Sequence, residues 1–274
     1  MTTTAGGSVL RSWLAPGPPA QPPVVTDRRE RRLIGLEIAV VVTVTLGLSA
    51  LRSALSLLEA LLAPAPLSEQ QVALNAPAST DLWLDLAFQL TRALQLAGWG
   101  ALAAYLLLRA GFALRRVGLD GRRPGRDALH SAGLAALIGI PGLGLYLLGR
   151  LAGITPDVAP STLTDAWWRI PVLVVSAAAN SWAEEVVMIG YLLTRLRQLG
   201  FSENRSALVA AVLRGAYHLY QGVGAFVGNL VMGLVFARYW QRTNRLWPLV
   251  GAHLLIDVVA FVGYALLVDV LPFT

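Results

Sequence analysis

The sequence contains no cysteine and no lysine. Without cysteine the chain can form no disulfide, no thiolate nucleophile and no cysteine-ligated zinc site. All 22 basic residues are therefore arginine, and the formal net charge is +6. Charged residues are also scarce, at 14% of the chain, whereas 55% of the residues are hydrophobic. A composition this apolar is typical of a membrane protein.

The arginines cluster beside apolar segments and lack the interleaved aromatic residues of a nucleic-acid surface, so we expect no nucleic-acid partner. Their distribution instead predicts topology, because loops retained in the cytoplasm carry the excess of positive residues. The segments predicted to be cytoplasmic are "RRERR" at 28–32 and the loops 109–130, 195–205 and 238–245, while the arginine-free loop 63–81 is predicted to lie outside. The N-terminus is thus predicted to be cytoplasmic and the C-terminus to lie outside.

Apolar runs long enough to cross a bilayer, which takes about 20 residues each, recur along the chain. The predicted fold class is all-α, a polytopic membrane helix bundle of about seven transmembrane helices. The predicted spans are 33–51, 82–109, 131–153, 170–194, 206–222, 223–241 and 246–270. The fifth and sixth spans meet with almost no loop, so we expect them to form a tight antiparallel hairpin.

Two regions are predicted. Residues 1–27, rich in Thr, Gly and Pro, are expected to form a disordered cytoplasmic tail without an export signal. Residues 28–274 are expected to form the transmembrane helical domain. An arginine-only basic complement with abundant Ala, Gly and Leu is typical of GC-rich bacteria, which predicts a multi-pass protein of a bacterial cell (inner) membrane surrounded by the lipid bilayer.

Two adjacent carboxylates, Glu184 and Glu185, fall inside the predicted fourth span. A carboxylate near the middle of a bilayer costs at least about 2.5 kcal/mol, so it needs a partner or a task. The structural alternative is that each glutamate pairs with an arginine only to join helices. Further polar residues occur in the later spans, namely Arg214, His218, Asn229, His253 and Asp257.

Helical spacing groups these polar residues, because residues four apart stack on one face of a helix. Arg214 and His218 are predicted to share a face of the fifth span. His253 and Asp257 are predicted to share a face of the seventh. The site is therefore expected inside the bundle, between the fourth, fifth and seventh spans.

Two imidazoles and a carboxylate that converge in a dry bundle support two hydrolytic mechanisms. In the first, Glu184, His218 and His253 hold a divalent metal such as zinc and leave an open position for water. In the second, no metal is needed: Glu184 deprotonates a water molecule and the imidazoles donate to the developing oxyanion. Two asparagines are predicted to support the site, Asn180, one turn before Glu184, and Asn229 on the sixth span.

These residues, in this order, resemble the CPBP family of intramembrane proteases, which includes CAAX-processing endopeptidases and bacteriocin-processing or abortive-infection relatives. The family's motifs are Glu-Glu-x-x-x-Arg, Phe-x-x-x-His and His-x-x-x-Asn or Asp, each on a membrane helix. The matching residues, within a protease-like core of about 168–262, are Glu184, Glu185, His218, His253 and Asp257. The resemblance implies an endopeptidase that cleaves a membrane-associated protein or peptide, with the first glutamate activating water and the histidines binding metal or stabilising the oxyanion.

Two positions depart from the family pattern. Ile189 stands where the first motif has arginine, and Arg214 stands where the second has phenylalanine. Our hypothesis is that Arg214 reaches across from the fifth span to compensate the charge of Glu185, which leaves Glu184 free for chemistry. The alternative raised by Ile189 is a catalytically degenerate membrane scaffold or immunity-type protein that uses the same fold for partner binding.

The third motif bears on the mechanism. An ionised Asp257 cannot donate a hydrogen bond to an oxyanion as asparagine can, and it suits orienting His253 or completing a metal shell. This favours the metal mechanism. The metal-free route stays open, because a carboxylic acid buried in the membrane can be neutral at pH 7.

Overall fold

The computed structural model describes residues 22–267, and the ranges 1–21 and 268–274, with most of the predicted tail, lie outside the described residues. The helices are α2 (Arg28–Val42), α3 (Leu48–Leu62), α4 (Leu82–Arg109), α5 (Pro124–Leu151), α6 (Arg169–Glu184), α7 (Leu192–Gln198), α8 (Glu203–Ala216), α9 (Val223–Thr243) and α10 (Trp247–Leu267). Two π-helical segments, Thr43–Gly47 and Glu185–Tyr191, join α2 to α3 and α6 to α7, and short 3₁₀ turns occur at Leu67–Glu69, Leu114–Arg116 and Leu219–Gln221.

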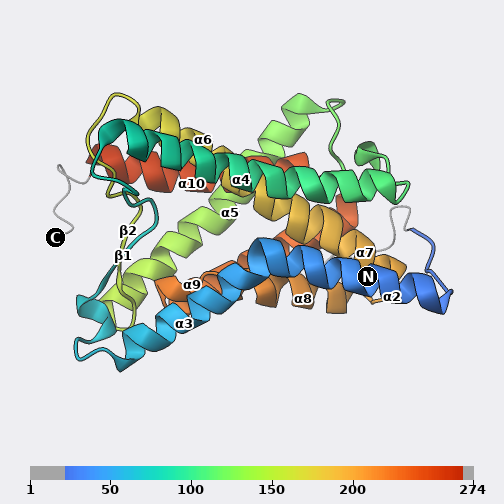
Figure 1. The fold of residues 1–274 in the computed structure, drawn as a ribbon, viewed down its shortest axis with the longest axis horizontal. Helices are drawn as coiled ribbons and strands as arrows, with labels where there is room; N and C mark the ends of the chain where they lie inside the picture. The colour runs from blue at the N-terminus through green and yellow to red at the C-terminus, as the bar shows by residue number, and fades with distance from the viewer. Residues whose placement is uncertain (1–21, 268–274) are drawn as a thin grey trace, which may run out of the picture.

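The helices form a bundle around the continuous helix 169–198. Figure 1 shows α4, α6 and α10 side by side, while α2 and α3 form one long rod on the opposite side of the molecule. Of the most apolar stretch of helix 169–198, 67% is buried, compared with 33% or less in the other candidate spans. The residues that carry the first motif therefore lie on the central helix of the bundle.

The predicted helical membrane bundle is confirmed, but the predicted count of seven spans is not supported. Within residues 22–267, five helices are long and apolar enough to cross a membrane: Arg28–Leu62, Pro124–Leu151, Arg169–Gln198, Val223–Thr243 and Trp247–Leu266. The predicted fifth span, 206–222, corresponds to α8, whose 14 residues are too few for a hydrocarbon core of about 30 Å. Helix α4 has 28 residues, but its polar side chains keep it outside this group.

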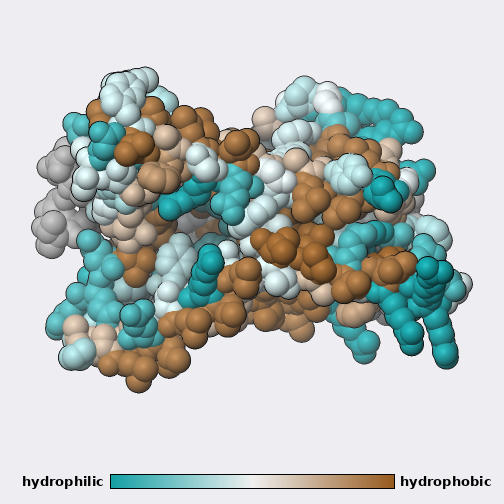
Figure 2. Space-filling model, viewed as in Figure 1, coloured by the Kyte–Doolittle hydropathy of each residue, from teal (hydrophilic) through white to brown (hydrophobic). Residues whose placement is uncertain are grey.

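The outer surface of the bundle is apolar. In Figure 2 hydrophobic residues form a band along the rod of α2 and α3 and patches elsewhere on the visible face, and hydrophilic residues gather at the end where α2 begins. Many leucines of the long rod are exposed, for example Leu36, Leu51 and Leu58 at 53–60%. Leucines in that position cost little when lipid rather than water surrounds the protein.

One small sheet was not predicted. The strands β1 (Gln71–Ala73) and β2 (Asp157–Ala159) pair in parallel, with Val72 opposite Val158. They tie the α3–α4 connection to the α5–α6 connection. Three-residue strands that lie more than 80 residues apart give no periodic signal in the sequence, so this element could not be expected from it.

The turn that starts α10 is held by the loop after α4. Gly118 has φ +86°, which favours glycine, and a Cβ at this position would collide with the backbone of Asn244 and Arg245. The Trp240 indole also donates to the carbonyl of Val117 at 3.0 Å. This contact fixes where α10 begins, and α10 carries two of the candidate site residues.

We expect Gly118→Ala to destabilise the protein by about 1–3 kcal/mol, because the new methyl group meets backbone atoms and φ is unfavourable. The measurement is thermal unfolding of the protein in detergent. Gly121→Ala is the matched control, because open space surrounds that position in the same loop. Equal unfolding temperatures for the two variants would contradict this account.

Candidate active site

The two glutamates lie where an α-helix changes to a π-helix. Glu184 is the last residue of α6 and Glu185 is the first residue of the π-helical segment Glu185–Tyr191, which we call the π segment. Glu184 is 4% exposed and Glu185 is fully buried. A π-helical turn inside a longer helix is rare and frequently marks a functional site.

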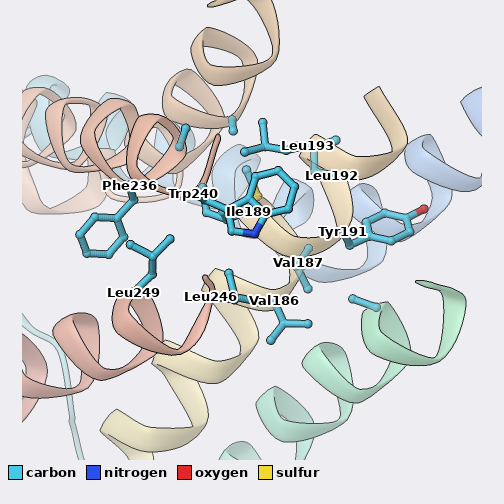
Figure 3. Packing of buried hydrophobic residues seen from close by; sticks show 14 of the residues in the cluster. Val186, Val187, Ile189, Tyr191, Leu192, Leu193, Phe236, Trp240, Leu246 and Leu249 are labelled. Atoms are coloured by element: carbon cyan, nitrogen blue, oxygen red, sulfur yellow. The ribbon is translucent and has the colours of Figure 1, made fainter. Parts of the chain in front are cut away.

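The positive charge beside these carboxylates comes from α8. Arg214 is fully buried and forms an ion pair with Glu185 through its Nη2 atom, while its Nη1 lies 3.7 Å from Glu184 Oε2. Ile189, at the family's arginine position, is fully buried in the apolar cluster with Trp240 and Leu246 (Figure 3). The cation is therefore present, but it reaches Glu185 from another helix.

The second motif does not follow the predicted helical face. Helix α8 ends at Ala216, so His218 lies beyond it, in the turn before α9. The prediction that Arg214 and His218 stack on one helical face is therefore wrong, although they do touch: His218 Nδ1 lies 3.0 Å from the carbonyl oxygen of Arg214. Because a carbonyl only accepts, Nδ1 carries the hydrogen of this bond, and Nε2 of a neutral ring keeps its lone pair.

The contact between Tyr217 and Glu184 was not predicted from the sequence. The hydroxyl of Tyr217 donates to Glu184 Oε2 at 2.7 Å, and the residue is 6% exposed. The end of α8 turns this side chain toward α6. An aromatic residue beside a motif histidine was the one available signal, and such residues are ordinarily taken as interfacial anchors.

The third motif follows the helical prediction. His253 Nδ1 lies 2.8 Å from Glu185 Oε1, and His253 Nε2 lies 3.5 Å from Asp257 Oδ2 one turn further along α10. The amide of Asn180 donates to the same Asp257 oxygen at 3.0 Å, which joins α6 to α10. Asn180 thus contributes a contact between two helices.

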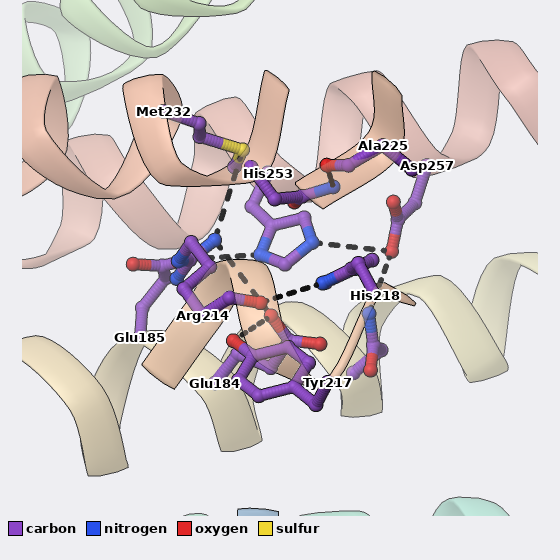
Figure 4. A network of polar contacts seen from close by, with 11 residues as sticks. Glu184, Glu185, Arg214, Tyr217, His218, Ala225, Met232, His253 and Asp257 are labelled. Carbon is purple, nitrogen blue, oxygen red and sulfur yellow. Dashed lines mark hydrogen bonds and ion pairs between the residues drawn. The ribbon is translucent and has the colours of Figure 1, made fainter. Parts of the chain in front are cut away.

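Figure 4 shows that side chains from α6, the π segment, α8, the following turn and α10 point toward one another. The eighth predicted site residue, Asn229, lies on α9 and donates to the carbonyl of Ala225 in its own helix at 3.0 Å. Among the described residues, the second oxygen of Glu185 has no hydrogen-bond partner. The cluster is therefore buried, mostly paired and enclosed by helices.

The fit of a divalent metal can be judged from the same contacts. In the described part of the chain, ligand atoms of Glu184, Glu185 and His253 lie within 4.8 Å of one another, and His218 is not in this group. The predicted ligand set had His218 in place of Glu185. Glu185 Oε1 already accepts from Arg214 and His253, and the guanidinium lies beside Glu184 as well. A divalent ion here would have to displace or face a fixed cation, so the residues fit it poorly.

The site thus combines a buried acid pair, a guanidinium and two imidazoles from helices of an apolar bundle. Residues 166–259, about a third of the chain, match the family model "Type II CAAX prenyl endopeptidase Rce1-like", which confirms the resemblance to the CPBP and CAAX protease family. No curated protein and no solved structure matches the chain. The segment that matches contains both glutamates, Arg214, both histidines and Asp257.

We expect Arg214→Met to destabilise the protein by about 3–5 kcal/mol, because it leaves the Glu185 carboxylate buried without its cation. Thermal unfolding in detergent measures the loss. The double variant Arg214→Met with Glu185→Leu removes both charges, and it should recover most of the stability while staying inactive. If the single and double variants were equally unstable, the charge pairing would not be what holds these helices.

Proposed function

We propose that this protein is an intramembrane endopeptidase that hydrolyses a peptide bond through a water molecule activated by Glu184, without a metal. The observation that carries the proposal is the pair of contacts at Glu184. Tyr217 donates to one carboxylate oxygen of this residue at 2.7 Å, and Arg214 lies 3.7 Å from the same oxygen. A carboxylate oriented in this way keeps its other oxygen for the proton of a water molecule.

The reaction follows from the hydrogen-bond inventory. Water gives one proton to Glu184 while its oxygen attacks the carbonyl carbon of the substrate. The second water hydrogen donates a hydrogen bond to the lone pair of His218 Nε2 and stays on the new hydroxyl group. When the tetrahedral intermediate collapses, the C–N bond breaks and Glu184 returns the proton to the departing amine. The cycle therefore consumes only water.

We propose that His253 is the donor to the oxyanion. Its two ring nitrogens face carboxylate oxygens of Glu185 and Asp257, an arrangement that places a hydrogen on each nitrogen. The Nε2 hydrogen then lies between Asp257 and the substrate, available to the developing oxyanion. Asp257, held by Asn180, orients the ring rather than donating itself.

The substrate that fits such a site is a membrane-associated peptide or protein, because the acid pair lies within the bundle and the outer surface is apolar. We also propose that the end where α2 begins faces the cytoplasm of a bacterial cell, since the four arginines of the segment 28–32 lie there. The scaffold alternative was motivated by the missing arginine at Ile189. The absence of that arginine no longer argues for a scaffold, because Arg214 forms the ion pair with Glu185.

We expect Glu184→Gln to abolish cleavage while the protein stays folded, since an amide cannot accept the proton of water. The assay uses purified protein in proteoliposomes with a library of peptides anchored by a lipid or an apolar helix, and mass spectrometry detects the products. Glu59→Gln, at an exposed position of α3, is the control that should cleave like wild type. A Glu184→Gln variant that cleaves normally, or a wild type that cleaves nothing, would rule out the protease.

We expect cleavage to survive prolonged dialysis against a strong zinc chelator, because the fixed guanidinium supplies positive charge at the position a metal would need. The rate before and after dialysis is compared, together with the metal content of the same samples. Loss of activity that zinc restores would show that the metal mechanism, with Glu184 and His253 as ligands, is the correct one.

A further inference from the structure

A partly buried acidic contact lies outside the matched core, on helix α2. Glu37 of α2 accepts from the hydroxyl of Tyr191 at 2.8 Å, and the guanidinium of Arg195 binds both of its oxygens, with Nη2 at 2.6 Å from Oε2. The Glu37 side chain is 27% exposed, while Tyr191 and Arg195 are buried. A bidentate, partly buried pair of this kind is among the stronger polar contacts in proteins.

The two partners of Glu37 lie on either side of a structural junction. Tyr191 is the last residue of the π segment, and Arg195 lies in α7, which starts at Leu192. One carboxylate therefore binds the end of the π-helix and the beginning of the following α-helix. The opposite end of the π segment is held by the contacts of Glu185 with Arg214 and His253.

These two anchors fix the rotation of the helix about its axis. A π-helical turn contains an additional residue compared with an α-helical turn, and each residue of an α-helix advances the side-chain direction by about 100°. If the π segment relaxed to an α-helix, one end would therefore rotate by about 100° relative to the other. With Tyr191 and Arg195 held by Glu37, that rotation would turn Glu184 and Glu185 away from their partners.

We propose that Glu37, together with Tyr191 and Arg195, is a positioning device that keeps the π segment wound so that both site glutamates face Tyr217, Arg214 and His253. Helix α2, which lies outside the matched residues 166–259, is thus required to complete the active site. The effect on catalysis rests on the proposed function, while the effect on the helix does not.

The test uses the full-length protein in lipid nanodiscs and two measurements on the same samples. In Glu37→Gln, hydrogen–deuterium exchange of amides 185–191 should rise by about tenfold, while exchange within α9 stays at the wild-type level. The value of kcat should fall by about tenfold with KM nearly unchanged, because substrate binding is retained and the reacting groups are misaligned. Glu30→Gln, at an exposed position of the same helix, is the matched control for both measurements.

Tyr191→Phe removes one hydrogen bond and no charge, so it should give a smaller increase in exchange in the same segment, and it replaces Glu37→Gln if that variant fails to fold. Wild-type exchange at 185–191 in these variants would overturn the proposal, as would a fall in kcat without any change in exchange. A wild type that cleaves nothing would refute the protease function alone, because the exchange measurement still decides whether Glu37 holds the π segment.

Discussion

The contact between Arg214 and Glu185 is the constraint on which the rest of the structure depends. Neither group can be left alone in a bundle surrounded by lipid, because breaking a buried pair costs about 3–5 kcal/mol. Helix α9 covers the arginine: a Cβ at Gly233 would lie 2.8 Å from Ala211 Cα, and Phe236 and Met232 contact the guanidinium. The need to enclose one cation therefore brings α8, α9 and the central helix together.

The short helix α8 ends at Ala216, directly after the turn that carries Arg214. Only after Ala216 does the chain turn, so that Tyr217 reaches Glu184 and the His218 ring folds back on the carbonyl of Arg214. A helix that continued to residue 222 would have pointed consecutive side chains in directions about 100° apart. Because of the turn, the neighbouring residues Tyr217 and His218 both reach the candidate site.

The positions of the site residues could be predicted from the sequence only where the helix that carries them is regular. His253 and Asp257 were placed correctly, because α10 is a regular helix and residues four apart stack. The relation of Arg214 to His218 was not placed correctly, because no proline directly follows α8 and the glycine near its end, Gly215, lies inside the helix rather than after Ala216. The π segment was equally invisible, since its residues, Glu185 to Tyr191, are almost continuously apolar and buried on every side, and so carry no period.

The sequence departs from the family motif at Ile189 and Arg214, yet a positive charge still lies beside Glu185. Coulomb interaction depends on where a charge lies in space and not on which helix supplies it. Ile189 is fully buried in the apolar cluster with Trp240 and Leu246, whereas the Arg214 guanidinium contacts Glu185 directly. A missing arginine in the linear pattern is therefore weak evidence for an inactive site, because the loss at one position and the gain at the other leave the Glu185 carboxylate paired.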